Sequence, residues 1–338
     1  MTRESTPALY DERLHEMLRY KRPHGSRSEA QWIERFIMPY DPTNVDDMAY
    51  VITVLHPDGR TPHTMFSCHT DTVHRHEGRQ RIKFNRATQT YFKADGEPLG
   101  ADDAAGAWLM LEMIDAGVPG CYFFHRAEEC GGLGSSHIAK HYPDVLYKFK
   151  RAIAFDRRSS TSVITHQGWG RCCSDVFAQA LADALNANEH NIYEPDDTGV
   201  FTDTANYTDI IPECTNLSCG YLNEHSGNET LHLPTLFNLR DSCLTIDWEA
   251  LPTNRDPLVD DYNSYYKQTT DNDYKSYYKQ TTDNDYSLYS MTKAEMFDMA
   301  YTDPETFVML VRNELFGEPI ESAKYAGSAY GYDEFMYK

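Results

Sequence analysis

The sequence has few cationic side chains and few cysteines, and it has no long apolar run. Its 31 Lys and Arg residues stand against 52 Asp and Glu residues, which gives a formal net charge of −21 over 338 residues. A negative field of this size repels phosphate backbones and anionic lipid headgroups. No stretch approaches the ~20 apolar residues that a membrane span needs. We therefore expect neither nucleic acid nor a membrane among the partners.

The eight cysteines are too sparse for a disulfide scaffold, and no two of them form a Cys-x-x-Cys pair. They lie in apolar or motif-like surroundings, which is typical of reduced thiols that serve as small core residues. The opening residues 1–17 are polar and then helical in pattern, without the apolar segment of a secretory signal. Together these features predict a soluble, cytoplasmic protein.

Helical and strand-like patterns alternate from about residue 8 to residue 250. Short strands separated by helices predict an α/β fold, with a mostly parallel central sheet and helices on both faces. Two late strands are expected around Leu217 and Leu244. Loops at the carboxyl ends of such strands are where binding sites are built. The earlier strands are expected at 49–55, 64–68, 121–125 and 152–155, and the main helices at 104–116 and 174–186.

The composition changes after Trp248. The segment SYYKQTTDNDYK at 264–275 is followed by SYYKQTTDNDYS at 276–287, and aliphatic residues are nearly absent there. We interpret 251–290 as a flexible, acidic and tyrosine-rich tether, because such a composition cannot bury a core. Residues 291–338 are expected to form short helices with a loose end, and these helices are a candidate contact for a protein partner. The folded domain is then 1–250.

Five groups of polar side chains fall at expected strand ends or helix starts. Because the carboxyl ends of parallel strands share one edge of a sheet, the five groups should meet there. Glu128-Glu129 and Asp156 end buried apolar runs, and buried carboxylates need a metal ion or a cationic partner. Each group alone has an ordinary structural explanation, but the joint arrangement favours a site. The groups are His69-Thr70-Asp71, Asp102-Asp103, Glu128-Glu129, Asp156 and Asn223-Glu224-His225-Ser226.

These residue types suit a pair of zinc ions. A short carboxylate can bridge the ions, imidazole and carboxylate ligands complete each side, and a further carboxylate can take the proton of a bridging water. In the spacing His69-x-Asp71, the aspartate can accept the second ring N–H of the histidine and fix its tautomer.

Five motifs in order carry a resemblance to a known family. The strings FSCHTDTVH, LGADDAAGAW, HRAEECGGLGS, AFDRR and CGYLNEHSGNE resemble the motifs of the dinuclear zinc exopeptidase superfamily, over about residues 8–250. The resemblance makes 1–250 the catalytic domain and implies two zinc ions, for which cobalt or manganese could substitute. It implies that His69 and Asp156 hold one ion, that Glu129 and His225 hold the other, that Asp102 bridges both, that Glu128 is the general base and that Asp103 caps a helix.

The spacing also bears on the subfamily. Superfamily members with a lid insert it between the equivalents of Asp156 and His225, and a lid domain needs roughly 100 residues beyond the core elements. No such insertion fits here, and lidless members are mostly aminopeptidases. We therefore expect an aminopeptidase that acts on short peptides, with Glu128 and Asp71 as its catalytic residues. Candidate substrate contacts are Arg157, Thr202 and Asp203. The alternative interpretations are a surface pair of arginines, Arg157-Arg158, and an ordinary turn at 202–204.

Three alternatives stay open at this point. An N-acyl amino acid deacylase or a carboxypeptidase would use the same metals, with Arg157 or Arg158 binding the substrate carboxylate. A single-zinc glutaminyl cyclase needs fewer ligands than the sequence offers. A catalytically retired binding protein would ordinarily have lost ligands, and none is missing here.

Overall fold

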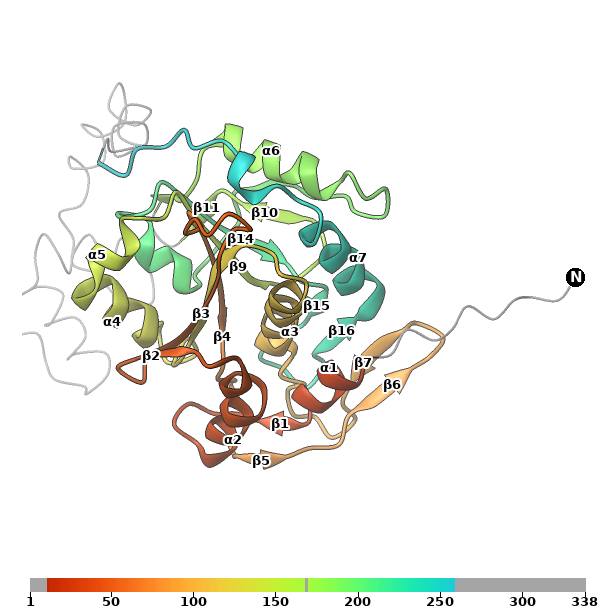
Figure 1. Ribbon diagram of the computed structural model, residues 1–338. Helices are drawn as coiled ribbons and strands as arrows, with labels where there is room; N and C mark the ends of the chain where they lie inside the picture. Colours follow the sequence, from red (N-terminus) through yellow and green to blue (C-terminus); the bar gives the residue numbers. More distant parts are fainter. Residues whose placement is uncertain (1–10, 168–169, 259–338) are drawn as a thin grey trace, which may run out of the picture. The chain divides into compact units, whose positions relative to one another are not determined.

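Four parallel strands lie at the centre of the computed structural model, which describes residues 11–167 and 170–258 (Figure 1). Every residue of β4, β8 and β14 is buried. Strands that are covered on both faces are near-continuous apolar runs, as the string GCYFFH of β8 illustrates. In spatial order the four are β14 (Glu213–Ser218), β9 (Arg151–Arg157), β4 (Thr64–His69) and β8 (Gly120–His125).

Four further strands extend this centre to a mixed sheet of eight. Beyond β8, β3 (Ala49–Val54) and β2 (Thr43–Val45) add antiparallel pairings. Beyond β14, β10 (Ser162–Ile164) runs antiparallel and β13 (Glu194–Asp196) is parallel to β10. Four of the seven pairings are parallel, which confirms the expectation of a mostly parallel central sheet.

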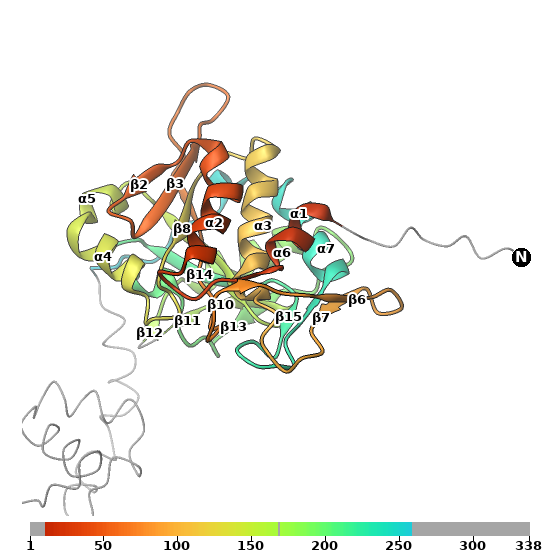
Figure 2. The ribbon, with the colours of Figure 1, turned by 90° about the horizontal axis from the view of Figure 1, so that it is seen from below.

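Helices cover both faces of the sheet, as the two views show (Figures 1 and 2). The strand period of two sends alternate side chains to opposite faces. Tyr122 and Phe124 of β8 therefore join the larger apolar cluster, while Cys121 and Phe123 join the smaller one. The larger cluster lies under α1 (Glu12–Met17), α2 (Arg27–Phe36), α3 (Ala101–Asp115), α6 (Asp175–Leu185) and α7 (Leu233–Cys243); the smaller one lies under α4 (Leu133–His141), α5 (Pro143–Leu146) and the 3-10 helix η2 (Asp203–Tyr207).

A smaller sheet joins two distant parts of the chain. Its strand order is β15 (Tyr221–Leu222), β16 (Thr230–His232), β7 (Thr90–Phe92) and β6 (Lys83–Asn85). It fixes the loop after β15 near the segment that leads into α3. The remaining short elements are β1 (Tyr20–Lys21) with β5 (Gly78–Arg79), β11 (His166–Gln167) with β12 (Gly170–Arg171), and the 3-10 helices η1 (Met38–Tyr40) and η3 (Trp248–Ala250).

One expected strand is wrong. Leu244 follows α7 as its C-cap and does not lie in a strand. The segment from Leu233 begins with a proline in the first helical turn, which suits a helix start. Its buried Leu236, Leu239 and Cys243 follow helical spacing, so the helix buries one face.

No lid domain is found among the described residues between Asp156 and His225. They form β10, the hairpin β11–β12, α6, β13, η2 and β14, most of which build or cover the main sheet. Residues 259–290 of the tether expected at 251–290, and the helical segment expected at 291–338, lie outside the described residues. Residues 251–258 are described, and there the side chain of Arg255 donates to the carbonyl oxygens of Thr208 and Pro212 at 2.8 and 3.1 Å.

The approach of α3 to β9 depends on Gly106. A Cβ atom built on Gly106 would lie 2.1 Å from the carbonyl oxygen of Phe155 and 2.6 Å from Oδ1 of Asp103. The first atom belongs to the backbone, and the carboxylate of Asp103 is held by the backbone N–H groups of Gly106 and His69, so Gly106→Ala should destabilise the protein by about 1–3 kcal/mol. The midpoint of urea unfolding measures this change. Gly170→Ala is the control, since a Cβ there meets nothing within 4 Å; equal midpoints for the two variants would contradict the close approach.

Candidate metal site

The side chains singled out in the sequence meet at the carboxyl ends of the central strands. His69 is the last residue of β4, Glu128 and Glu129 follow β8, and Asp156 lies near the end of β9. Two further side chains come from the start of α3 and from the loop after β15, namely Asp102 and His225. Three overlapping sets place possible ligand atoms within 4.8 Å of one another: His69, Asp102 and Asp156; His69, Glu128 and Glu129; and Asp102, Glu129 and His225.

The carboxylate of Asp102 lies between two imidazoles. Its Oδ1 is 3.0 Å from Nε2 of His69, and its Oδ2 is 3.0 Å from Nε2 of His225. The same ring nitrogens lie 3.5 Å from Oδ1 of Asp156 and 3.1 Å from Oε2 of Glu129. Two of the sets therefore share Asp102, as the two ligand groups implied by the family resemblance do. Their binding of metal stays a prediction.

The electrostatics of the two histidines reflect these carboxylates. Burial by itself would lower the pKa of His69, but Asp156, Asp102 and Asp71 raise it well above its ordinary value. Hydrogen bonds to Asp102 and Glu129 raise the pKa of the half-exposed His225 to about 11. The neighbouring carboxylates therefore favour positive charge at both ring positions.

The carboxylates greatly outnumber the cations that contact them. Seven carboxylates lie in or beside this cluster. Across residues 11–167 and 170–258, no lysine or arginine forms an ion pair with any of them, and the only basic side chains within ion-pairing distance of them are histidines. Burying unpaired charge costs several kcal/mol per ion. Within the same residues, the buried Oε1 of Glu129 also lacks a hydrogen-bond partner. The possible ligand atoms, from His69, Asp102, Glu128, Glu129, Asp156 and His225, are of the kinds that bind metal ions. The seven carboxylates are those of Asp71, Asp102, Asp103, Glu128, Glu129, Asp156 and Asp203.

Asp103 has a different task from its neighbour. Its Oδ1 accepts the backbone N–H of Gly106 at 2.8 Å, and its Oδ2 accepts the backbone N–H of His69 at 3.3 Å. The dihedral angles of Asp102 and Asp103 are not helical, so the regular part of α3 begins after them. Asp103 thus caps the helix, as the resemblance implied.

Asp71 supports the site without lining the pocket. Its Oδ1 is 3.5 Å from Nδ1 of His69 and accepts the backbone N–H of Glu128 at 3.1 Å. Its Oδ2 accepts the backbone N–H of Glu129 at 3.2 Å. One carboxylate therefore holds the end of β4 and the turn after β8 together. Asp71 is fully buried, so it acts through its neighbours.

Glu128 lines the pocket beside the candidate ligands. Burial, together with the charges of Asp156, Asp203 and Asp102, raises the pKa of its carboxyl group well above the ordinary value. The main-chain N–H of Glu128 is held by Asp71, while its side chain faces the cavity. A carboxyl group in this position can accept and release a proton.

Two of the three candidate substrate contacts lie elsewhere. Thr202 is 1% exposed, and its hydroxyl donates to Oδ2 of Asp156 at 2.6 Å. Asp203 is also 1% exposed and does not line the pocket; its Oδ2 is 3.4 Å from Nδ1 of the buried His125. Burial raises the pKa of Asp203 to about 8, and Asp156 and Asp71 add to the shift. Of the three, only Arg157 lines the pocket, and its contact with substrate stays a prediction.

Sequence reasoning missed several supports of the site. The carboxylate of Glu229 accepts the backbone N–H groups of Leu99, Gly100 and Asp102 at 2.8, 2.9 and 3.0 Å. It stands four residues after His225, so it ties the His225 loop to the loop that presents Asp102. Its position inside the motif CGYLNEHSGNE was the available signal, but the contact spans more than a hundred residues of chain.

Asp156 has further partners. The hydroxyl of Tyr221 donates to its Oδ1 at 3.0 Å. The side-chain amide of Asn216 accepts the backbone N–H of Asp156 at 2.9 Å and donates to its carbonyl oxygen at 2.7 Å. Together with Thr202, these contacts fix both the backbone and the carboxylate of the candidate ligand.

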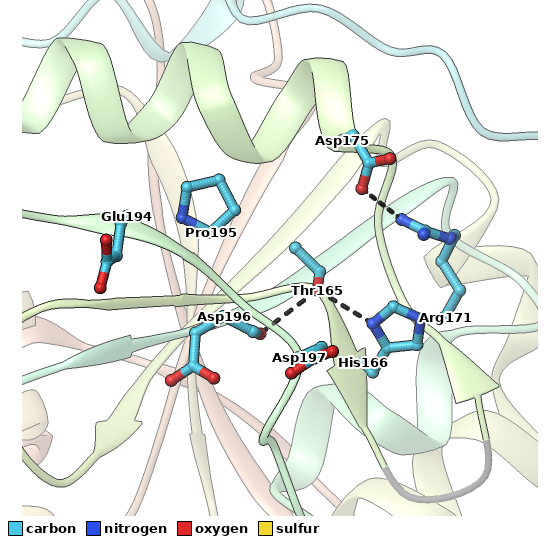
Figure 3. Close-up of a pocket in the computed structure, with 8 residues that line it drawn as sticks. All are labelled: Thr165, His166, Arg171, Asp175, Glu194, Pro195, Asp196 and Asp197. Carbon is cyan, nitrogen blue, oxygen red and sulfur yellow. Dashed lines mark hydrogen bonds and ion pairs between the residues drawn. The ribbon is translucent and has the colours of Figure 1, made fainter.

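A pocket of about 360 Å³ opens over this cluster. Its floor is formed by candidate ligands, and the rest of its lining includes Arg157, Arg158, Ile164, Val200, Phe201 and Glu224. A second pocket of about 400 Å³ lies beside β13 (Figure 3). Thr165, Arg171 and Asp196 are among its lining residues, and none of the candidate ligands reaches it. The chemistry of the cluster therefore belongs to the first pocket.

Comparison with known proteins gives a clear result for the fold. No family model and no curated protein matches the sequence. The structure is similar to that of aminopeptidase PepT from Bacillus cereus ATCC 10987, with a TM-score of 0.57 at 13% identity, over 70% of this chain and 98% of that chain. This chain shares the fold of that aminopeptidase.

Two further solved structures agree. A tripeptidase (SAV1512) from Staphylococcus aureus subsp. aureus Mu50 gives a TM-score of 0.55 at 15% identity, over 70% of this chain and 97% of that chain. A TET aminopeptidase from the marine sediment archaeon Thaumarchaeota archaeon SCGC AB-539-E09 gives 0.54 at 10% identity, over 71% and 98%. At such identities the likeness establishes the fold alone. Within the described part of the chain, no helix combines the length and apolar character needed to cross a bilayer.

If the candidate site holds metal, removal of the metal should destabilise the protein. Addition of zinc to chelator-treated protein, at about a hundred times its dissociation constant, should raise the melting temperature by about 5–10 °C, because bound cations relieve carboxylate repulsion. Asp102→Asn should remove most of this rise, since it weakens both ligand sets. Differential scanning calorimetry measures the shift. The exposed Asp209→Asn is the control; a rise of the same size in Asp102→Asn would contradict the shared-ligand geometry.

The support from Glu229 predicts a second effect. Glu229→Gln replaces one acceptor oxygen by an amide NH2 that faces backbone N–H donors, so Asp102 should lose its fixed position. Metal affinity should fall by about 10–100-fold, as it does when the partners of metal ligands are removed. Competition with a fluorescent zinc chelator gives the affinity. Glu189→Gln changes the same functional group at an exposed position and should have no effect; unchanged affinity in Glu229→Gln would refute the positioning role.

Proposed function

We propose that this protein is a zinc-dependent aminopeptidase that hydrolyses peptide bonds of short peptides. The observation that carries the proposal is the carboxylate of Asp102, 3.0 Å from each of two imidazoles, on the floor of a pocket that Glu128 also lines. The shared fold and the titles of the similar structures, which name aminopeptidases and a tripeptidase, support the same activity.

The ligand assignment follows the two sets that share Asp102. His69 and Asp156 would hold one zinc ion, Glu129 and His225 would hold the other, and Asp102 would bind both. Cobalt or manganese could replace zinc, since the donors are imidazole nitrogens and carboxylate oxygens. When bound, the ions supply Lewis acidity toward the peptide carbonyl and make water a stronger nucleophile.

Glu128 is the general base in this proposal. It would take the proton of the attacking water and pass it to the leaving amine, a role that requires a carboxylate in the pocket without a fixed partner of its own. Among the hydrogen bonds within residues 11–167 and 170–258, none involves the side chain of Glu128. Asp71 is a positioning residue, because it orients His69 and holds the backbone of Glu128 and Glu129.

The arginines of the pocket favour an aminopeptidase over a deacylase or a carboxypeptidase. Those alternatives need a cation to bind the substrate carboxylate. Nη2 of Arg157 already donates to the carbonyl and hydroxyl oxygens of Thr198 at 3.1 and 2.9 Å, and Arg158 pairs with Glu224 at 3.1 Å. A free α-amino group would instead meet an acidic floor. This charge pattern supports recognition of a peptide N-terminus.

The test compares metal content and turnover in the wild type and in Glu128→Ala. We expect about two zinc ions per chain in both proteins, and a loss of aminoacyl-anilide cleavage of about 10²–10⁴-fold in the variant, because only proton transfer is removed. Inductively coupled plasma mass spectrometry and absorbance of the released aniline measure the two quantities. Glu189→Gln serves as the control at an exposed site.

Other outcomes would replace the proposal. Cleavage of N-blocked or carboxyl-terminal substrates only, dependent on Arg157 or Arg158, would point to a deacylase or a carboxypeptidase. A protein without metal and without turnover would be a binding protein on a peptidase fold.

A further inference from the structure

The pocket over the candidate metal site has one apolar wall. Val200 and Phe201, in the loop between β13 and η2, form it together with Ile164 of β10. The side chains of Val200 and Phe201 are 68% and 38% exposed. Single exposed apolar residues are common on protein surfaces. Val200 and Phe201 are adjacent and line the same cavity as Glu128, so they place exposed apolar surface beside the proposed site of reaction.

Hydrogen bonds hold this loop at both ends. On one side, Nη2 of Arg157 donates to both oxygens of Thr198, and Oδ1 of Asp196 accepts the backbone N–H of Thr198 at 2.8 Å. On the other side, the hydroxyl of Thr202 donates to Asp156. Arg157 and Asp156 are neighbours on β9, so the loop is fixed to the strand that carries a candidate ligand.

Two glycines set how closely the loop approaches its surroundings. A Cβ atom on Gly199 would lie 2.1 Å from the carbonyl oxygen of His166 and 2.4 Å from Cγ2 of Ile164. A Cβ atom on Gly132 would lie 2.5 Å from Cζ of Phe201. Gly132 belongs to the turn that begins with Glu128 and Glu129, since its N–H donates to the carbonyl oxygen of Glu128 at 2.8 Å. The ring of Phe201 thus contacts the turn that carries the proposed base.

We propose that Val200 and Phe201 determine specificity, and that the pocket selects peptides with a large apolar N-terminal side chain, such as leucine or phenylalanine. The proposal rests on the aminopeptidase function proposed above. An apolar side chain gains free energy by leaving water against this wall. An acidic side chain would lose hydration there without a cationic partner, because Arg157 and Arg158 are already bonded to Thr198 and Glu224.

The experiment compares kcat/KM for leucyl, phenylalanyl, alanyl, glutamyl and lysyl anilides in the zinc-loaded, full-length protein. The leucyl and phenylalanyl substrates should exceed the alanyl substrate by about 10–100-fold, from the burial of the additional apolar surface. Val200→Asp and Phe201→Ala should each reduce the ratio of leucyl to alanyl kcat/KM by about tenfold. A ratio is insensitive to the fraction of folded enzyme. Val176→Asp, at a 53% exposed position on α6, is the matched control and should leave the ratio unchanged.

Failure of this proposal is distinguishable from failure of the proposed function. The specificity assignment would be overturned if the wild type cleaved glutamyl or lysyl anilides best. It would also be overturned if the ratio of leucyl to alanyl kcat/KM were unchanged in both Val200→Asp and Phe201→Ala. Either result would leave the proposed aminopeptidase function intact. If no anilide is cleaved, the apolar wall can still be tested by binding. Isothermal titration calorimetry would compare the affinities of leucine hydroxamate and alanine hydroxamate for the wild type and for Val200→Asp. Tighter binding of the leucine compound, lost in Val200→Asp, would support it; equal binding of the two compounds would overturn it.

Discussion

The contact on which the site depends is the carboxylate of Asp102 between the imidazoles of His69 and His225. It joins the end of β4, the start of α3 and the loop after β15, which are far apart in the chain. Buried carboxylates repel one another and lose hydration, so the surrounding cluster has a stable place in the fold only where cations balance it. Histidines supply part of that balance in the described structure, and the donor set suits metal ions for the rest.

Around this contact, buried polar residues hold the candidate ligands in place, through backbone groups or, for His69, through the second ring nitrogen. Asp71 holds His69 and the Glu128–Glu129 turn, Glu229 holds the approach to Asp102, and Asn216 holds the backbone of Asp156. These bonds place the ligands on rigid elements at the ends of parallel strands, where the backbone already converges. A geometry held in this way needs little rearrangement when a cation binds.

The loop at 197–201 connects the metal site with the proposed choice of substrate. The strand residues Asp156 and Arg157 hold its two ends, so the wall formed by Val200 and Phe201 keeps a constant position relative to the candidate ligands. The pocket accordingly has an acidic floor and an apolar wall. A peptide with a cationic N-terminus and an apolar first side chain complements both.

The sequence by itself determined the alternation of strands and helices, the polar groups at strand ends and the capping role of Asp103, because these depend on neighbouring residues or on short motifs. Leu244 shows the limit even of local patterns, since a strand-like string there ends a helix. Only the tertiary structure decided that Thr202 bonds to Asp156, that Asp203 is buried beside His125 and that Glu229 supports Asp102. Such contacts join residues tens to more than a hundred positions apart, and the direction of a side chain follows from packing, which no local pattern records.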